Sequence, residues 1–306
     1  YFRRQIIIMK TVGFIGLGDM GMGMAKNLLK SGFRVKGFDL REDRLKNFAE
    51  AGGEPVKSCA EAGDDADAAF VMVLNGGQAK SVILGENGLL DTMKPGSIII
   101  ITATIGRKDI KDIEVAVTEK GINMVDSGVS GGRNGADAGT LTLMVATERD
   151  VFEECQDLFN AIGENIHYVG KDIGMGQVVK SCLQALIGVT FEGVFETLAL
   201  GAKAGVKPEV LYDVISTTGV GSPLFKSTTK FIMERKFKNT GSHIGTMYKD
   251  LGITMSLAKE CGVPMFATSI AMEMFQAGIS SFPDEDNWSV VKVFERITGA
   301  EVKKSE

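Results

Sequence analysis

The sequence contains few residues that bind metals or form disulfides. Its 306 residues include two histidines and four cysteines, and no Cys-x-x-Cys pair occurs. This composition offers neither an obvious zinc site nor a disulfide framework. We therefore expect no metal ion, and reduced thiols of the kind found in cytoplasmic proteins. The four scattered cysteines are Cys59, Cys155, Cys182 and Cys261.

One-sided charge and long apolar runs are also absent. The 34 basic and 39 acidic residues are mixed along the chain and give a net charge of −5, which argues against a nucleic-acid surface. No uninterrupted apolar run approaches the ~20 residues of a membrane span. Residues 1–8 precede Met9, lack the features of a signal peptide, and are interpreted as an extension outside the fold. A chain of this length, 44% hydrophobic, can form one large or two smaller cores.

The most informative segment lies near the start of the chain. An apolar strand over residues 11–15 leads into the glycine-rich turn of residues 16–21, and a helix-forming stretch follows over 22–30. A second strand over 33–38 ends in Asp39. This order is typical of the βαβ unit that holds a dinucleotide pyrophosphate on a helix N-terminus. A purely structural βα turn, the alternative, would not require the terminal acid.

Each glycine of this turn has a physical role in such a site. Gly16 permits the tight turn, Gly18 lets the backbone approach the phosphates, and Gly21 lets the helix pack closely on the strand. The cofactor-binding residues predicted for the whole turn are Gly16, Leu17, Gly18, Asp19, Met20 and Gly21.

The acid that ends the second strand bears on cofactor choice. Asp39 can accept hydrogen bonds from the ribose hydroxyls, and its carboxylate would repel a 2′-phosphate, which favours NAD over NADP. Arg41 keeps NADP open, because a nearby arginine can grip that phosphate. We therefore predict NAD as the cofactor, with NADP possible.

The two halves of the chain show different patterns. Further strand-like runs occur at 68–74, 97–101, 122–125, 140–146 and 166–169, with helical patterns at 107–120 and 150–162. After Gly174 the patterns are helical, at 178–204, 208–215, 247–260, 265–276 and 287–297. This predicts an α/β fold, a doubly wound, mostly parallel Rossmann sheet of about six to eight strands, followed by an all-α domain joined by a long helix. The predicted domains are 9–172, which binds the dinucleotide, and 173–306, which serves substrate binding and oligomerisation.

Three places outside the turn could carry chemistry. The glycine-rich loop expected over 126–139 contains Ser130, Gly131 and Gly132, which could form a small nest for a carboxylate or could be an ordinary flexible loop. Lys180 has apolar neighbours, which favour the neutral amine that a general base requires, although a lysine on such a helix is commonly a snorkelling surface residue. The pair Lys249-Asp250 could be a solvated surface pair.

Four motifs together resemble the β-hydroxyacid dehydrogenase family, which includes 3-hydroxyisobutyrate dehydrogenase, tartronate semialdehyde reductase and L-threonate dehydrogenase. They are F-I-G-L-G-D-M-G-M-G-M-A-K-N-L (14–28), D-S-G-V-S-G-G (126–132), G-Q-V-V-K (176–180) and K-D-L-G (249–252). Their order and spacing extend the resemblance over residues 9 to about 300.

The resemblance implies roles for particular residues. Lys180 is implied as the catalytic lysine. The substrate-binding residues that it implies are Ser130, Gly131, Gly132, Gln184 and Asp250. Leu74, Asn75 and Thr104 are implied to line the cofactor cleft, and Lys249 is implied to close over the nicotinamide.

The chain departs from the family pattern at two places. Many members have proline where Gly128 stands, so we expect a looser loop here. Many also carry two asparagines where this chain has Leu183 and Gln184. The segments 73–78 and 285–292, together with Gln184, look most like the L-threonate branch, but that branch has a polar residue at the position of Leu183.

The sequence thus predicts an NAD(P)-dependent oxidoreductase that transfers hydride between the nicotinamide and a small hydroxycarboxylic acid, such as L-threonate, 3-hydroxyisobutyrate or tartronate semialdehyde and glycerate. The expected partners are the hydroxycarboxylate and further copies of the chain, in a homodimer or homotetramer, with no nucleic acid and no membrane. An imine reductase on the same architecture is an alternative, although those relatives usually replace the lysine. A non-catalytic NAD(P)-binding module is another alternative. Such a module would tolerate loss of Lys180 and of the Ser-Gly-Gly motif, yet this chain has both.

Overall fold

The computed structural model describes residues 10–304, and the extension expected over residues 1–8 lies outside this range. Contacts divide the chain into two compact units after Lys180, here named the N-terminal unit and the helical unit. The division falls inside the long helix α9 (Met175–Lys203). The domain boundary proposed from the sequence at 172/173 lies just before that helix begins.

An eight-stranded sheet forms the centre of the N-terminal unit, in the order β3-β2-β1-β4-β5-β6-β7-β8. All neighbouring strands are parallel except β6 and β7, which confirms the predicted fold class. The strands are β1 (Thr11–Ile15), β2 (Arg34–Phe38), β3 (Glu54–Pro55), β4 (Ala68–Val71), β5 (Ile98–Ile101), β6 (Asn123–Ser130), β7 (Leu141–Ala146) and β8 (Gly163–Gly170).

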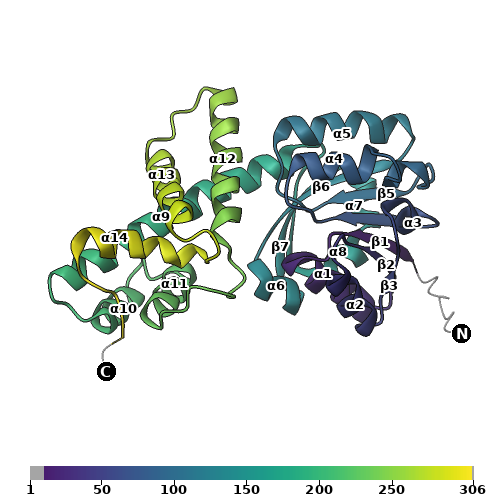
Figure 1. The fold of residues 1–306 in the computed structure, drawn as a ribbon. Helices are drawn as coiled ribbons and strands as arrows, with labels where there is room; N and C mark the ends of the chain where they lie inside the picture. Colours follow the sequence, from purple (N-terminus) through teal and green to yellow (C-terminus); the bar gives the residue numbers. More distant parts are fainter. Residues whose placement is uncertain (1–9, 305–306) are drawn as a thin grey trace, which may run out of the picture. The chain divides into compact units, whose positions relative to one another are not determined.

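Helices cover both faces of this sheet (Figure 1). Helices α1 (Asp19–Lys30), α2 (Glu42–Glu50) and α8 (Gln156–Ile162) contribute to the core on one face. Helices α3 (Cys59–Gly63), α4 (Gly76–Leu84) and α5 (Arg107–Glu119) contribute to the core on the other face. The remaining short helices are η1 (Leu89–Asp91), α6 (Gly132–Ala138) and α7 (Arg149–Glu154).

Burial on both faces explains the continuous apolar runs of the central strands. Phe70 of β4 and Ile100 of β5 belong to the core on the α1 side, whereas Val71 and Ile101 belong to the core on the α4 and α5 side. Since neighbouring residues of a strand point to opposite faces, both sets must be apolar.

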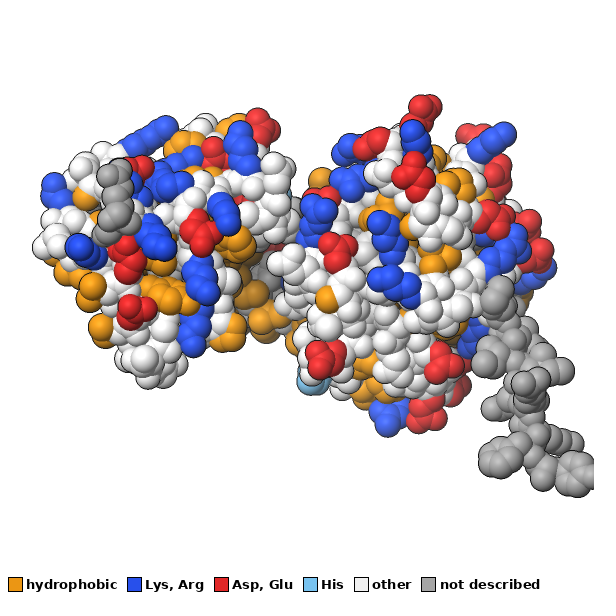
Figure 2. Space-filling model, turned by 90° about the horizontal axis from the view of Figure 1, so that it is seen from below, with side chains coloured by type: hydrophobic (Ala, Val, Ile, Leu, Met, Phe, Trp, Pro, Cys, Tyr) orange, Lys and Arg blue, Asp and Glu red, His pale blue; other side chains and the backbone are white. Residues whose placement is uncertain are grey.

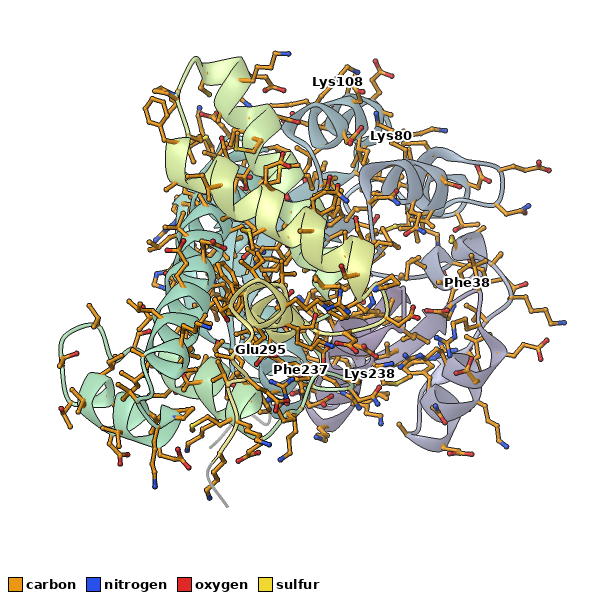
Figure 3. The ribbon with its side chains drawn as sticks, turned by 60° about the vertical axis from the view of Figure 1, so that its left-hand side comes forward. Phe38, Lys80, Lys108, Phe237, Lys238 and Glu295 are labelled. Atoms are coloured by element: carbon orange, nitrogen blue, oxygen red, sulfur yellow. The ribbon has the colours of Figure 1, made fainter. Side chains whose placement is uncertain are left out.

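The outer surfaces of α4 and α5 are joined by ion pairs. Lys80 of α4 lies 2.8 Å from both Asp109 and Asp112 of α5, and Lys108 also reaches Asp112 at 2.8 Å. Figure 3 labels these two lysines on the neighbouring helices. Such exposed pairs contribute little to stability, so the layer depends on the apolar core beneath them.

Two local predictions in this unit were wrong. Residues 126–130 were expected in a loop but belong to β6, because β7 pairs with them antiparallel from Asp126↔Ala146 to Ser130↔Thr142 and satisfies their backbone groups. The single helix expected over 150–162 is divided into α7 and α8, which meet at Cys155.

The helical unit packs around an aromatic cluster. Phe191, Phe195, Phe275 and Trp288 are buried there, and the Trp288 indole N–H donates to Thr240 Oγ1 at 2.9 Å. Besides α9, its helices are α10 (Pro208–Ser216), α11 (Pro223–Met233), α12 (Ile244–Cys261), α13 (Phe266–Ser281), η2 (Asn287–Val290) and α14 (Val291–Thr298). Within residues 181–304 the only β pairing is an isolated bridge between His243 and Asp286.

Helix α9 is more apolar than the sequence analysis indicated. It has 29 residues, and an 18-residue window of it has a mean hydropathy of 1.4, so length and composition alone would allow it to cross a membrane. Half of that window is buried inside the fold, and a single helix of this kind is weak evidence for a membrane span.

Candidate active site

The glycine-rich turn after β1 has the geometry of a phosphate-binding turn. Gly16 has φ +92°, and a Cβ there would lie 2.3 Å from Met72 O, so only glycine fits. A Cβ at Gly21 would lie 1.9 Å from Gly16 O, whereas a Cβ at Gly18 would meet nothing within 4 Å. The turn is therefore closed on the protein side and open where Gly18 precedes the N-terminus of α1. This arrangement fits a dinucleotide pyrophosphate.

Asp39 connects the end of β2 to this turn. Its Oδ2 accepts the Leu17 N–H at 2.7 Å, and its Oδ1 accepts the Arg41 N–H at 2.9 Å. The Arg41 guanidinium instead pairs with Asp43, at 2.7 and 3.0 Å. Asp39 thus joins the turn, through Oδ2, to the start of α2, through Oδ1. The Arg41 side chain is already engaged with a carboxylate.

The residues expected along the cofactor cleft follow the carboxyl ends of β4 and β5, where ligands bind in such sheets. Asn75 caps α4, since its Oδ1 accepts the Gln78 N–H at 2.9 Å. Leu74 is 55% exposed, and Thr104 is partly buried. The structure therefore gives Asn75 a capping role besides the cofactor role expected for it.

The Ser-Gly-Gly motif lies where β6 gives way to α6. Ser130 is the last residue of β6, Gly131 is the N-cap of α6, and Gly132 begins that helix. Gly131 and Gly132 have φ values of +135° and +59°, a backbone that other residues rarely adopt. The chain thus turns sharply here and leaves backbone N–H groups at the end of a central strand.

Lys180 is buried rather than snorkelling, with 7% of its surface exposed. Its helix, α9, packs closely on β6, because a Cβ at Gly128 would lie 2.8 Å from Lys180 Cβ. Gly128 is itself a buried β6 residue paired with Met144 and not part of a loop. Lys180 therefore lies beside the strand that ends in the Ser-Gly-Gly motif.

Two further residues of this site were not singled out from the sequence. Asp126 of β6 and Gln177 of α9 are both buried, and Gln177 Nε2 donates to Asp126 Oδ1 at 2.8 Å. Burial raises the pKa of Asp126 to about 6, although hydrogen bonds from Gln177 and from backbone N–H groups oppose the shift. The available signal was an acid placed directly after the strand-like run 122–125.

The other predicted residues form a cluster within the helical unit. Gln184 Nε2 donates to Asp250 Oδ2 at 2.7 Å, and Lys249 Nζ lies 2.9 Å from Asp250 Oδ1. Asp250 is 4% exposed. Lys249-Asp250 is thus a largely buried pair, contrary to the solvated surface pair that was left open.

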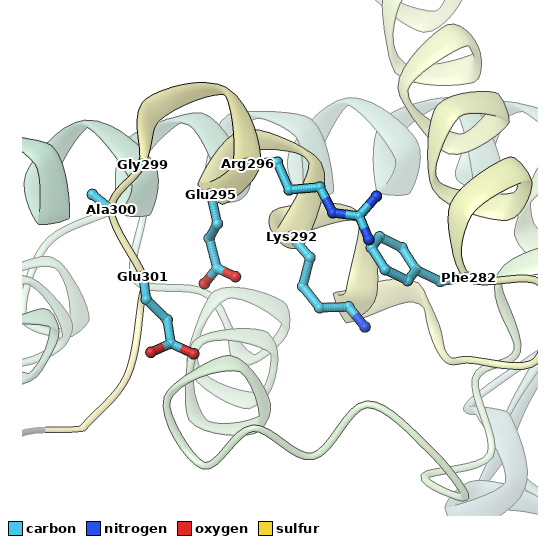
Figure 4. A pocket seen from close by; sticks show the side chains of 7 residues that line it. All are labelled: Phe282, Lys292, Glu295, Arg296, Gly299, Ala300 and Glu301. Carbon is cyan, nitrogen blue, oxygen red and sulfur yellow. The ribbon is translucent and has the colours of Figure 1, made fainter.

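The helical unit also has a pocket near the end of the chain, with a volume of about 320 Å³ (Figure 4). Its charged lining residues have partners: Lys292 pairs with Glu285, and Glu295 and Glu301 pair with Arg235. Arg296 stacks over Phe282 at 4.6 Å. The pocket contains none of the predicted site residues. Within residues 10–304 no group of three or more His, Cys, Asp or Glu side chains could hold a metal ion.

The fold and the turn thus define a dinucleotide-binding α/β protein with a helical second unit, and comparison with known proteins identifies the family. Residues 11–170 match the model of the NAD binding domain of 6-phosphogluconate dehydrogenase. Residues 174–294 match the model described as NAD-binding of NADP-dependent 3-hydroxyisobutyrate dehydrogenase. The chain belongs to the β-hydroxyacid dehydrogenase family. It is an NAD(P)-dependent dehydrogenase acting on CH–OH groups, with a small hydroxy acid as substrate.

Individual relatives match over nearly their whole length. The chain is 36% identical to 2-(hydroxymethyl)glutarate dehydrogenase from Eubacterium barkeri, over 95% of this chain and 97% of that protein. It is 34% identical to L-threonate dehydrogenase from Cupriavidus necator, over 93% and 96%. The crystal structure of 3-hydroxyisobutyrate dehydrogenase from Salmonella typhimurium superposes with a TM-score of 0.85 at 30% identity, over 93% and 99%.

Proposed function

We propose that the chain uses Lys180 as general acid and base to interconvert a small hydroxycarboxylate and its carbonyl form, with NAD as the preferred cofactor. The observation that carries this proposal is the burial of Lys180 beside the strand that ends in the Ser-Gly-Gly motif. A buried amine next to backbone N–H groups can serve an anionic substrate that carries a hydroxyl group.

The proposed roles follow from the chemistry of each group. Bound NAD would supply the hydride acceptor for oxidation of the substrate carbon. The Lys180 amine takes the hydroxyl proton in that direction and returns it in reduction. Ser130, Gly131 and Gly132 hold the carboxylate. The residues proposed to hold the cofactor are Gly16, Leu17, Gly18, Asp19, Met20, Gly21, Asp39, Leu74, Asn75, Thr104 and Lys249.

For the identity of the substrate, the informative residues are Gln184 and Asp250, both in the helical unit. Gln184 and Asp250 form a hydrogen-bonded pair that can orient a hydroxyl group, because the pair contains both donor and acceptor atoms. The relatives named above act on 2-(hydroxymethyl)glutarate, L-threonate and 3-hydroxyisobutyrate by their names. We propose a substrate of this class, and Gln184 favours a polyhydroxy acid such as L-threonate.

The test is a screen of purified protein with L-threonate, 3-hydroxyisobutyrate, glycerate and 2-(hydroxymethyl)glutarate, with NAD and NADP in parallel. Lys180→Ala should then lose about 10²- to 10⁴-fold in kcat while its Kd for NADH stays near that of the wild type. Lys180→Arg should not restore turnover, because a guanidinium hardly deprotonates. Near-normal turnover of Lys180→Ala would remove the lysine from the mechanism and make Lys249 the next residue to test.

We also propose that the helical unit mediates homo-oligomer formation in a cytoplasmic enzyme. Most of the exposed large hydrophobic side chains belong to this unit, among them Leu186, Leu200, Val210, Val214 and Phe266. Figure 2 shows hydrophobic patches on its surface. Such patches commonly mark protein interfaces, and light scattering of the purified protein would test this proposal.

A further inference from the structure

A buried carboxylate and a buried amide connect three segments of the N-terminal unit. Asp126 is fully buried, and Gln177 is 2% exposed. Asp126 Oδ2 accepts the N–H groups of Gly174 at 2.9 Å and of Gln177 at 3.2 Å, while its Oδ1 accepts from Gln177 Nε2 at 2.8 Å. Asp126 thus holds the first turn of the helix that carries Lys180.

The capping of α9 comes from a distant strand. The first N–H groups of a helix have no partner within the helix and need acceptors. Ile173 and Gly174, which precede Met175, have no side-chain acceptor to offer, and Asp126 supplies two of the missing bonds. The helix start is therefore held by β6 as well as by its own flanking segment, where Asp172 O accepts the Met175 N–H at 3.1 Å.

The amide of Gln177 extends this connection to the segment after β5. Its Nε2 also donates to Ala103 O at 3.1 Å, and its Oε1 accepts the Ile105 N–H at 3.0 Å. These two bonds flank Thr104, so one side chain fixes the backbone on both sides of a residue expected along the cofactor cleft. In this orientation of the amide, its nitrogen donates both hydrogen atoms and its oxygen accepts one hydrogen bond.

The packing leaves the helix start little freedom to move. A Cβ at Gly176 would lie 2.7 Å from Asp126 O and 2.7 Å from Met144 O, so α9 rests directly on the backbones of β6 and β7. Lys180 follows Gln177 by three residues and so lies one turn further along the helix. A change at the helix start is therefore transmitted to Lys180.

We propose that Asp126 and Gln177 are positioning residues that fix the spacing between Lys180 and the segment 103–105. The inference rests on the proposed role of Lys180, and neither residue touches substrate or cofactor in it. A displacement of about 1 Å at a reacting group can cost about 10²-fold in rate, so a rigid connection between base and cofactor cleft has a direct catalytic value.

Asp126→Asn tests the pair specifically. Asparagine keeps an oxygen for the backbone N–H groups but places an NH₂ group opposite Gln177 Nε2. If the Gln177 amide turned to accept from it, the bond from the Ile105 N–H would be lost. The matched control is Thr147→Val, which removes a buried hydrogen bond of 2.8 Å to Met124 O on the same strand. If Asp126→Asn does not fold, Gln177→Met replaces it as the test variant, because it removes the side-chain hydrogen bonds of the amide.

We expect Asp126→Asn to lower kcat by about 10- to 100-fold, with the Kd for NADH within about threefold of the wild type. A second readout needs no turnover: acetylation of Lys180 by acetic anhydride, followed by mass spectrometry. Loosening of the helix start should raise the labelling of Lys180 at least about fivefold over that in Thr147→Val. If Lys180 labelling rises while the wild type oxidises no hydroxy acid, the proposed function fails and the positioning role stands.

The decisive control exchanges the carboxylate of residue 126 and the amide of residue 177. In Asp126→Asn/Gln177→Glu the asparagine can donate to the carboxyl group introduced at position 177. That carboxyl group, in its neutral form, can donate to Ala103 O and accept the Ile105 N–H. The double variant should exceed both single variants in kcat and approach wild-type labelling of Lys180. The proposal would be overturned if the kcat losses of the two single variants simply added in the double variant. Equal labelling of Lys180 in Asp126→Asn and Thr147→Val would also overturn it.

Discussion

The preference for NAD can be predicted from the contacts of Asp39. Its two oxygens accept the Leu17 and Arg41 N–H groups, at 2.7 and 2.9 Å, so the carboxylate is held at the glycine-rich turn. The Arg41 side chain, which could neutralise a 2′-phosphate, is paired with Asp43. Asp39→Asn removes the charge, and Asp39→Asn/Asp43→Asn also releases Arg41.

The magnitude follows from Coulomb's law. Two unit charges 4 Å apart interact by about 1 kcal/mol in water and about 4 kcal/mol near a protein surface. Asp39 is partly buried, and a phosphate carries nearly two charges, so we expect about 2 kcal/mol against NADP, or about 30-fold in Kd. Asp39→Asn should remove most of this difference. It should also weaken NADH binding several-fold, because the asparagine NH₂ group cannot accept the second backbone N–H.

The assay is fluorescence titration of NADH and NADPH with the wild type and both variants, at low and high salt. The wild type should bind NADH more tightly than NADPH. The ratio of the two Kd values should become smaller in Asp39→Asn, and should become smaller still or reverse in the double variant. High salt should reduce this ratio of Kd values in the wild type, because salt screens the repulsion. Equal or tighter binding of NADPH by the wild type would refute the assignment of Asp39 as the discriminating charge.

Two further variants test other parts of the molecule. Ser130→Ala should raise KM for the best hydroxy acid much more than the Kd for NADH, and unchanged kinetics would make the Ser-Gly-Gly motif purely structural. Glu192 of α9 is buried, its Oε2 has no hydrogen-bond partner in residues 10–304, and burial, with help from Glu196, raises its pKa to about 7. Because the folded state holds this proton more tightly, stability should fall as the pH rises from about 4.5 to 7. Glu192→Gln should flatten that dependence in urea titrations and be more stable at pH 8 by about 1–3 kcal/mol, whereas an unaltered pH dependence would contradict the assignment.

The sequence predicted best what local patterns determine. The strand, turn, helix and second strand of residues 11–39 occur in the expected order, because each depends on neighbours in the chain, although the helix begins at Asp19 and not at Met22. The loop predicted for residues 126–130 was wrong because their structure depends on a distant segment. Glycine and serine there suggested a loop, but the strand is completed by β7 through Ser130↔Thr142, a pairing that local sequence does not encode.

Helix α11 was not predicted, although its start has local signals. Ser222 caps it by accepting the Phe225 N–H at 3.1 Å, and Pro223 occupies the first turn, where proline is favoured. The start of this helix is therefore encoded locally in the sequence. The division of the helix expected over 150–162 at Cys155 differs, because the whole stretch has one amphipathic pattern.

The candidate site divides in the same way. The glycine-rich turn and Asp39 could be found from spacing, whereas the roles of Ser130, Lys180, Gln184 and Lys249-Asp250 came from a resemblance to a family, since each had a plausible structural alternative. The burial of Lys180 and of Asp250 argues only against a surface location of these two residues, and burial is a property of packing between distant segments.

The pair of Asp126 and Gln177 marks the limit of what a sequence can indicate. Their side chains meet across 51 positions, and the bonds from Gln177 to the segment after β5 span 72 and 74 positions. Nothing in either local motif requires a partner of that type. A buried acid must have several donors around it to remain in the fold, and the donors to Asp126 include the start of a helix and the Gln177 amide. Asp126 is therefore buried where the helix of Lys180, the strand of the Ser-Gly-Gly motif and, through Gln177, the segment of Thr104 are joined.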